Sequence, residues 1–124
     1  TRQEGLKMGY YSHFDIDINI EGIPEATVKD IVERTFGKWI ADTLQLQADD
    51  LDVIISGVLY DVKWYSFARD VEALRKAIAE AGGEFAYGVI SRQGEDAGDG
   101  ERFVAEDGVL VRQVTRVTWV DAED

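Results

Sequence analysis

The chain has 124 residues, 45% of them hydrophobic, which predicts one domain with a buried core. Its formal net charge of −12 would repel nucleic-acid phosphates and anionic membranes, so we expect neither direct nucleic-acid binding nor membrane binding. The absence of cysteine excludes disulfides, thiolate metal sites and cysteine nucleophiles, and fits a cytoplasmic location, where the environment is reducing.

The predicted single domain covers residues 8–120. Residues 1–7 are polar and patternless, so we interpret them as an upstream extension or a cloning remnant before a natural start at Met8. Residues 121–124 are expected to form a disordered tail. The longest apolar run, residues 53–60, is far shorter than the roughly 20 residues of a membrane-spanning helix.

The first predicted strand is 13–21, because apolar and polar residues alternate along it. One face carries Phe14, Ile16, Ile18 and Ile20, and the other carries His13, Asp15, Asp17 and Asn19. Carboxylates beside a histidine suit metal-dependent or acid–base chemistry. Solubility alone also places such residues on a half-exposed strand, so we expect no catalytic residue here.

The first helix is predicted to start at Pro24, which fits the first helical turn, and to fade near Gln45. Its apolar residues recur at steps of three and four: Val28, Ile31, Val32, Phe36, Trp39, Ile40 and Leu44. Gly37 interrupts this pattern and indicates either close packing or a kink. A polar loop is expected at 47–50.

Residues 52–66 are rich in β-branched and aromatic side chains and predict either a hairpin or one long bent strand, since Gly57 interrupts them. Four residues are expected to share a face: Val58, Tyr60, Val62 and Trp64. A second amphipathic helix is predicted from Phe67, and Gly82-Gly83 is expected to end it. Its apolar stripe is Phe67, Val71, Leu74 and Ile78.

The last third, residues 84–120, predicts three consecutive strands. Phe85, Tyr87 and Val89 are expected to share one face of the first strand, and an acidic glycine-rich loop follows at 94–100. The second strand is predicted at 102–106. Asp107-Gly108 is a strong hairpin signal, because both central residues of that turn need positive φ.

Residues 109–120 are predicted to form the last strand, and its free edge would permit a homodimer. The order of elements predicts an α+β fold. We expect a mostly antiparallel sheet of five to six strands, with two helices packed on one face.

The acidic loop is a candidate cation site, because carboxylates suit calcium. Its spacing fails the EF-hand pattern, since Asp96 has no acid or amide two or four residues later. We therefore expect no metal and no cofactor. The chain also lacks a serine elbow, a Walker loop, a dinucleotide fingerprint and a zinc spacing, so we expect no enzyme.

The aromatic residues offer a candidate interface. Most of the following are expected to serve the core: Tyr10, Tyr11, Trp39, Tyr60, Trp64, Tyr65, Tyr87 and Trp119. Three tyrosines fall off the apolar stripes, and exposed aromatics beside acids are typical of protein-binding surfaces. The predicted partner-binding residues are Tyr10, Tyr11, Tyr65, Glu95, Asp96 and Asp99.

Two segments carry a resemblance. They are the start, Met8-Gly9-Tyr10-Tyr11-Ser12, and the segment 88–119, which contains the Gly94-Glu95-x-x-Gly98-Asp99 loop and ends in Val-Thr-Trp. Together with Arg102 and Asp107-Gly108, they resemble a family of small uncharacterised proteins of actinobacteria and actinophages. The resemblance implies a bacterial or phage cytosolic accessory protein, and it implies no activity.

We therefore expect a non-enzymatic acidic accessory protein, of phage or mobile-element type, that docks on a host protein. One alternative is a DNA mimic, an anti-defence inhibitor that occupies a basic nucleic-acid-binding site. Interspersed arginines argue against it: Arg69, Arg75, Arg92, Arg102, Arg112 and Arg116. A second alternative is a small metal-dependent hydrolase that uses Asp15, Asp17 and the loop acids.

Overall fold

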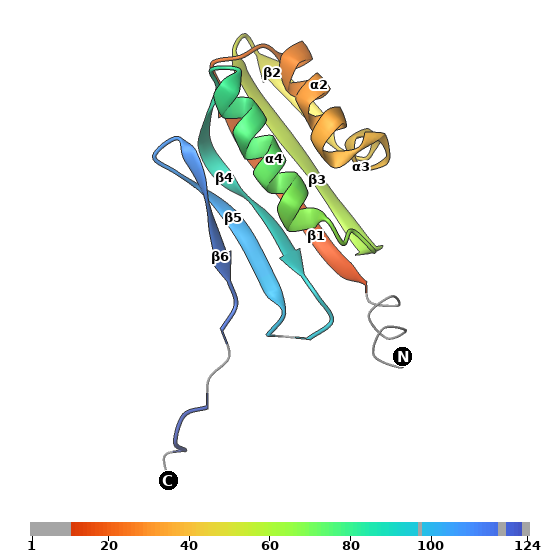
Figure 1. Cartoon of the computed structure of the whole chain (residues 1–124), viewed down its shortest axis with the longest axis vertical. Helices are drawn as coiled ribbons and strands as arrows, with labels where there is room; N and C mark the ends of the chain where they lie inside the picture. The colour runs from red at the N-terminus through yellow and green to blue at the C-terminus, as the bar shows by residue number, and fades with distance from the viewer. Residues whose placement is uncertain (1–10, 97, 117–118, 123–124) are drawn as a thin grey trace.

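The computed structural model describes residues 11–96, 98–116 and 119–122. The predicted α+β class is confirmed, because these residues form one open antiparallel sheet of six strands together with helices (Figure 1). The elements are β1 (Ser12–Glu21), α2 (Glu25–Phe36), α3 (Lys38–Asp42), β2 (Gln45–Asp49), β3 (Asp52–Val62), α4 (Phe67–Glu80), β4 (Glu84–Gln93), β5 (Gly100–Glu106) and β6 (Val109–Val114). The predictions for residues 1–7, the start at Met8 and Tyr10 lie outside the described residues.

The strand order is β2-β3-β1-β4-β5-β6, so the first strand of the chain lies in the middle of the sheet. Ile16 of β1 lies opposite Gly57 of β3 on one side and Ile90 of β4 on the other. The alternation predicted for β1 is confirmed: its isoleucines are buried, whereas Asp15 and Asp17 are exposed.

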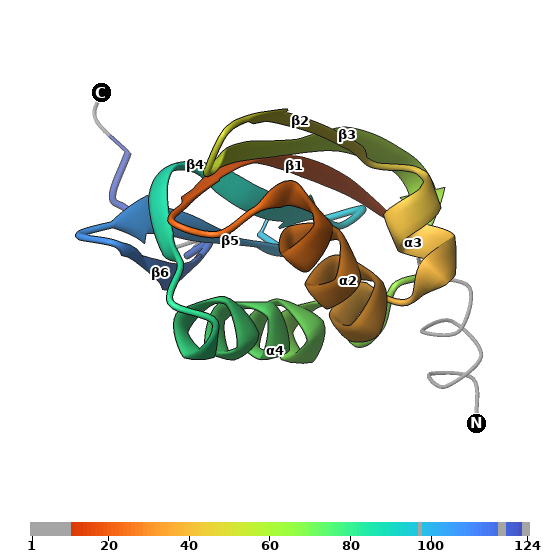
Figure 2. The same ribbon diagram turned by 90° about the horizontal axis from the view of Figure 1, so that it is seen from above.

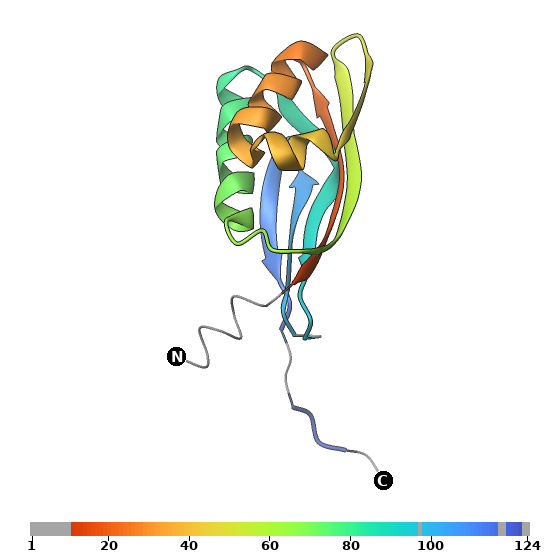
Figure 3. The ribbon, with the colours of Figure 1, turned by 90° about the vertical axis from the view of Figure 1, so that its right-hand side faces the viewer.

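The two predicted helices, α2 and α4, cover one face of the sheet, and no helix of the described residues lies on the other face (Figure 2). Figure 3 shows the same layering from the side. Each helix buries one apolar stripe, as predicted; the buried residues are Val28, Ile31, Val32 and Phe36 of α2, and Phe67, Val71, Leu74 and Ile78 of α4. We call the uncovered side of the sheet the open face. None of the helices in the described part of the chain has the length and apolar character needed to cross a membrane.

Gly37 divides the first predicted helix in two. Its φ of +88° and ψ of 152° end α2, and the short α3 follows at once. Only glycine adopts this backbone region readily, so the kink is confirmed. The alternative of close packing is wrong, because a Cβ built on Gly37 would meet no atom within 4 Å.

The polar loop expected at 47–50 is wrong, because these residues belong largely to β2. Asp49 lies opposite Asp52, and Asp50 adopts a positive φ of 59° in the tight turn between the strands. The side chains of an edge strand face solvent on most sides, so a strand such as β2 can be largely polar, with Leu46 as its contact with the core.

Within residues 52–66, Asp52–Val62 form one long strand, β3, and the hairpin alternative is wrong. The four residues expected on a common face do not share it. Ser12 lies opposite Val62 but Phe14 lies opposite Leu59, so β3 has an extra residue there. The positive φ of Asp61 marks this bulge. Val58 and Tyr60 are exposed, whereas Trp64, beyond the bulge, is buried in the core.

A second irregularity, in β4, changes the face of the sheet on which its side chains lie. Ile20 lies opposite Phe85 but Asn19 lies opposite Tyr87, so β4 carries one extra residue. Phe85 is therefore buried and Tyr87 is exposed, and the prediction that they share a face is wrong. Gly88 follows with a φ of +113°, where a Cβ would lie 2.1 Å from the carbonyl oxygen of Asp17.

The Asp107-Gly108 hairpin is confirmed, with φ values of 51° and 86°. The last strand ends at Val114, so the prediction of a strand through residue 120 is wrong. Thr115 donates a final backbone hydrogen bond to Gly100, the first residue of β5, and the partner strand begins there. Trp119 and Val120 are 100% and 84% exposed. In the predicted tail, only residues 121–122 are described, and they have no regular secondary structure.

Candidate functional site

One end of the sheet gathers segments that are far apart in the sequence. Ser12 at the start of β1 lies opposite Val62 at the end of β3, and His13 lies opposite Gln93 at the end of β4. Gln93 in turn lies opposite Gly100 at the start of β5. The first turn of α4 and the acidic β4–β5 loop therefore meet at this end, which we call the sheet end (Figure 1).

A pocket of about 390 Å³ lies at the sheet end, and we call it the end pocket. Its apolar lining comes from the end of β3, the β3–α4 connection and the first turn of α4, through Val62, Trp64, Phe67 and Ala68. Its polar lining comes from the strand ends, through Ser12, Arg92, Asp99 and Glu101. Tyr65, which is 67% exposed, also lines it. The pocket thus has an apolar side and a charged side.

The apolar side rests on packed aromatic rings. The Trp64 ring centroid lies 5.1 Å from those of Phe14 and Phe67, in tilted and edge-on arrangements. The Trp64 indole Nε1 donates a hydrogen bond of 2.8 Å to Asp70 Oδ2, and Ser66 Oγ donates another of 2.8 Å to the same oxygen. These contacts fix the ring that forms much of the apolar side.

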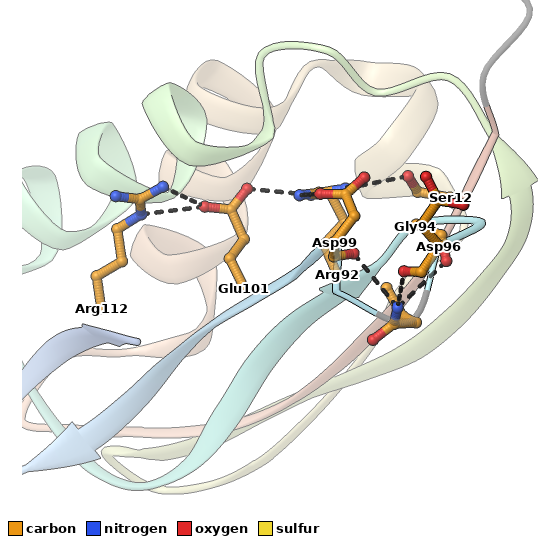
Figure 4. Close-up of polar contacts among 8 residues, drawn as sticks. Ser12, Arg92, Gly94, Asp96, Asp99, Glu101 and Arg112 are labelled. Atoms are coloured by element: carbon orange, nitrogen blue, oxygen red, sulfur yellow. Dashed lines mark hydrogen bonds and ion pairs between the residues drawn. The ribbon is translucent and has the colours of Figure 1, made fainter. Parts of the chain in front are cut away.

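The charged side is a chain of ion pairs (Figure 4). Arg92 Nη2 lies 2.7 Å from Asp99 Oδ1, and its Nε donates to Glu101 Oε1 at 3.0 Å. The second oxygen of Glu101 accepts from Arg112 Nη2 at 2.7 Å and from its Nε at 3.0 Å. Arg92 Nη1 also donates to Ser12 Oγ at 3.4 Å. Two guanidinium groups and two carboxylates therefore balance one another.

Arg92 remains charged in this position. The hydrogen bond with Asp99 raises the pKa of its guanidinium above the ordinary value; burial opposes this shift, and the hydrogen bond with Glu101 adds to it. The Arg92 and Glu101 side chains are only 18% and 10% exposed. The charged side is therefore a fixed array of paired ions that is suited to contacts and holds no labile proton on its arginines.

The structure places most of the predicted partner-binding residues at the sheet end. Tyr65 and Asp99 line the end pocket. Tyr11 is 41% exposed, and Lys63 Nζ lies 4.8 Å from its ring centroid. Glu95 and Asp96 are exposed in the β4–β5 loop.

The β4–β5 loop is fixed by its own backbone. Gly94 N donates to Asp99 O at 2.7 Å, and Gln93 Nε2 donates to Asp96 O at 2.9 Å. These bonds hold the exposed acids of the loop close to the end pocket.

The partner-binding residues predicted from the sequence do not include Arg92, Glu101 or Trp64, which line the end pocket. One signal was available: at alternating positions, Glu101 falls on the same face as the buried Phe103. A charged residue on an otherwise apolar face indicates a paired or functional group. The core-facing position of Arg92 could not be predicted from alternation, because the β4 bulge moves Arg92 to the core face together with Ile90.

The other candidates do not assemble a site. His13, Asp15 and Asp17 are exposed on the open face, and their neighbours in register include Val58, Ser56 and Val89. Asn19, fourth in that row, is buried and donates a hydrogen bond to Asp52. Within 11–96, 98–116 and 119–122, no group of three or more His, Cys, Asp or Glu side chains is placed to hold a metal ion.

The expected core role of most tyrosines and tryptophans is wrong. Of those that the structure describes, Trp64 alone is buried, and the exposed ones are Tyr11, Trp39, Tyr60, Tyr65, Tyr87 and Trp119.

Comparison with protein-family models, curated proteins and solved structures finds no match for the chain. The resemblance to actinobacterial and actinophage proteins therefore stays a prediction.

Proposed function

We propose that the protein is a non-enzymatic acidic accessory protein that docks through its sheet end on a basic surface of a host protein. The observation that carries this proposal is the end pocket, where an aromatic apolar side adjoins carboxylates within one concave site. The resemblance to phage-associated proteins supplies the setting of a host cell.

The shape of the end pocket supports binding of a protruding side chain. Its volume of about 390 Å³ falls in the usual range of ligand pockets. Tryptophan and tyrosine are enriched among the residues that dominate interface energies, because they bury large areas. Trp64 supplies a fixed wall and Tyr65 an exposed rim, which together suit a hot spot of this kind.

The charge of the sheet end supports a basic partner. Asp61, Glu95 and Asp96 are exposed there. The exposed bases nearby are Lys63 of the β3–α4 connection and Arg69 of the first turn of α4, and Arg69 lies 3.8 Å from Asp70. Arg92 and Arg112 are neutralised by their own carboxylates. The excess of acids would attract a positively charged surface and increase the association rate at low salt.

The polar groups of the end pocket favour binding over catalysis. Ser12 Oγ accepts a hydrogen bond from Arg92, a cation that cannot act as a base. His13 points to the other face of the sheet, where its Nδ1 accepts from the backbone of Asp61. Neither the DNA-mimic nor the hydrolase alternative gains support, because paired arginines interrupt the acids and no metal-ligand group is found among the described residues.

The proposal is tested by replacing Tyr65 and measuring partner capture. Immobilised protein should retain a stoichiometric partner from an actinobacterial lysate at low salt, and Tyr65→Ala should weaken the affinity by about tenfold or more. Tyr87→Ala is the matched control, because Tyr87 is 57% exposed on the open face. Thermal unfolding of each variant checks that the fold is kept.

Two results would contradict the proposal. The first is a lysate that yields no stoichiometric partner at low salt. The second is a partner whose affinity falls as much with Tyr87→Ala as with Tyr65→Ala, because the open face would then be the binding surface.

A further inference from the structure

The backbone of β6 presents unpaired groups on one side. β6 is an edge strand with β5 as its neighbour, and no other described strand pairs with it. Thr115 N donates to Gly100 O, and the two-residue turn makes Glu106 and Val109 a hydrogen-bonded pair. Since such pairs alternate in an antiparallel ladder, the N–H and C=O groups of Leu110 and Arg112 point away from β5.

Residues 100–116, which are the β5–β6 hairpin and the two residues after it, carry no net charge in a strongly acidic protein. Residues 100–116 contain three acids and three bases: Glu101, Glu106, Asp107, Arg102, Arg112 and Arg116. The formal net charge of −12 therefore comes entirely from the rest of the chain. Two copies that approach each other through this segment therefore bring together surfaces with no net charge, and this adds less electrostatic repulsion than contact between acidic surfaces would.

β6 also has few of the features that normally protect an edge strand. Edge strands are guarded by proline, by charged side chains such as lysine, by bulges or by very short length. β6 has no proline or lysine, and its charged residue, Arg112, is already bound to Glu101. The other edge, β2, is five residues long and largely polar.

An apolar row on the open face ends at this edge. Val89 of β4 lies opposite Val104 of β5, which lies opposite Val111 of β6. Val111 is 36% exposed. The row would continue without interruption if the edge met a second Val111.

We propose that two copies of the chain pair antiparallel through β6, with Val111 of one copy opposite Val111 of the second. Leu110 then lies opposite Arg112 of the second copy, and their free backbone groups form the hydrogen bonds of the new ladder. The two sheet ends point in opposite directions, which keeps the acidic β4–β5 loops apart. Both end pockets stay open, so the dimer is independent of the partner-binding proposal.

The dimer is tested first by sedimentation velocity from low to high micromolar concentration. The wild-type chain should shift from monomer to dimer with concentration. Val111→Lys should remain monomeric, because it places two like charges directly opposite each other. Val58→Lys is the matched control. Val58 belongs to β3, is 49% exposed on the same open face of the sheet as Val111, and lies far from the β6 edge, so this variant should dimerise normally.

Single-cysteine variants then test the pairing, because the chain has no cysteine of its own. Val111 and its counterpart would form a non-hydrogen-bonded pair with Cα atoms about 4.5 Å apart, within the range of a disulfide. Val111→Cys should therefore cross-link in air, whereas Val109→Cys and Val58→Cys should not. A wild-type chain that stays monomeric at every concentration would overturn the proposal, as would a Val111→Cys variant that does not cross-link.

Discussion

At the scale of single residues, the charged side of the end pocket depends on Arg92. It is a cation on the core face of β4, and three groups satisfy it: Asp99, Glu101 and Ser12. Glu101 is itself only 10% exposed and is shared with Arg112. Removing Arg92 therefore takes hydrogen bonds from the largely buried Glu101 and from Asp99, and the loss of these bonds costs more than the ion pairs themselves contribute.

Replacing Arg92 should destabilise the fold. Arg92→Ala is expected to lower the free energy of unfolding by about 2–3 kcal/mol, because Glu101 and Asp99 lose the hydrogen bonds that Arg92 donates. Chemical denaturation followed by circular dichroism measures the change. In the control, Arg75→Ala removes the more exposed pair with Glu72 and should cost less than about 1 kcal/mol. Equal losses in the two variants would contradict the structural role of Arg92.

At the scale of elements, β4 shows best where sequence patterns fail. Alternation placed Phe85 and Tyr87 on one face, and the extra residue between them separates them. A bulge is set by contacts with the neighbouring strand, which alternation within one strand does not record. The same limit hid Arg92, and with it the charged side of the end pocket. The Asp107-Gly108 turn was predictable, because its φ requirement belongs to those two residues alone.

The β4 bulge predicts a large effect of adding one methyl group. Gly88→Ala should cost about 3–5 kcal/mol, because positive φ strain adds to a clash with the backbone of Asp17 and Ile18. Gly37→Ala is the matched control: its φ is also positive but its surroundings are empty, so strain alone of about 1–3 kcal/mol applies. Urea denaturation compares them, and a Gly88→Ala variant no less stable than Gly37→Ala would disprove the close approach.

At the scale of the whole molecule, the two-layer arrangement follows from periodicity, whereas the strand order does not. The striped helices and alternating strands predict a sheet covered on one face. The central place of β1 depends on its pairing with β3 and β4, and no local pattern records which strands meet. Five of the six partner-binding residues predicted from the sequence are described, and only the strand order reveals that they gather at one end.

The excess of acids predicts a salt response. Raising NaCl from low concentration to about 0.5 M should increase the free energy of unfolding by about 1 kcal/mol, because screening weakens the repulsion among carboxylates. A variant with Asp15→Asn and Asp17→Asn, both exposed on β1, should be more stable at low salt and respond less. A free energy of unfolding that falls with NaCl would refute this account.

The central position of β1 has a consequence for protein synthesis. β1 is the first described strand to leave the ribosome, yet Ile16 lies opposite Ile90, which is translated much later. At about 5–20 residues per second, several seconds pass between the two. In that interval β1 can form its backbone hydrogen bonds with β3, while the edge that later pairs with β4 stays unpaired. The speed of translation through residues 63–84 therefore sets how long a nascent chain offers that edge to wrong partners.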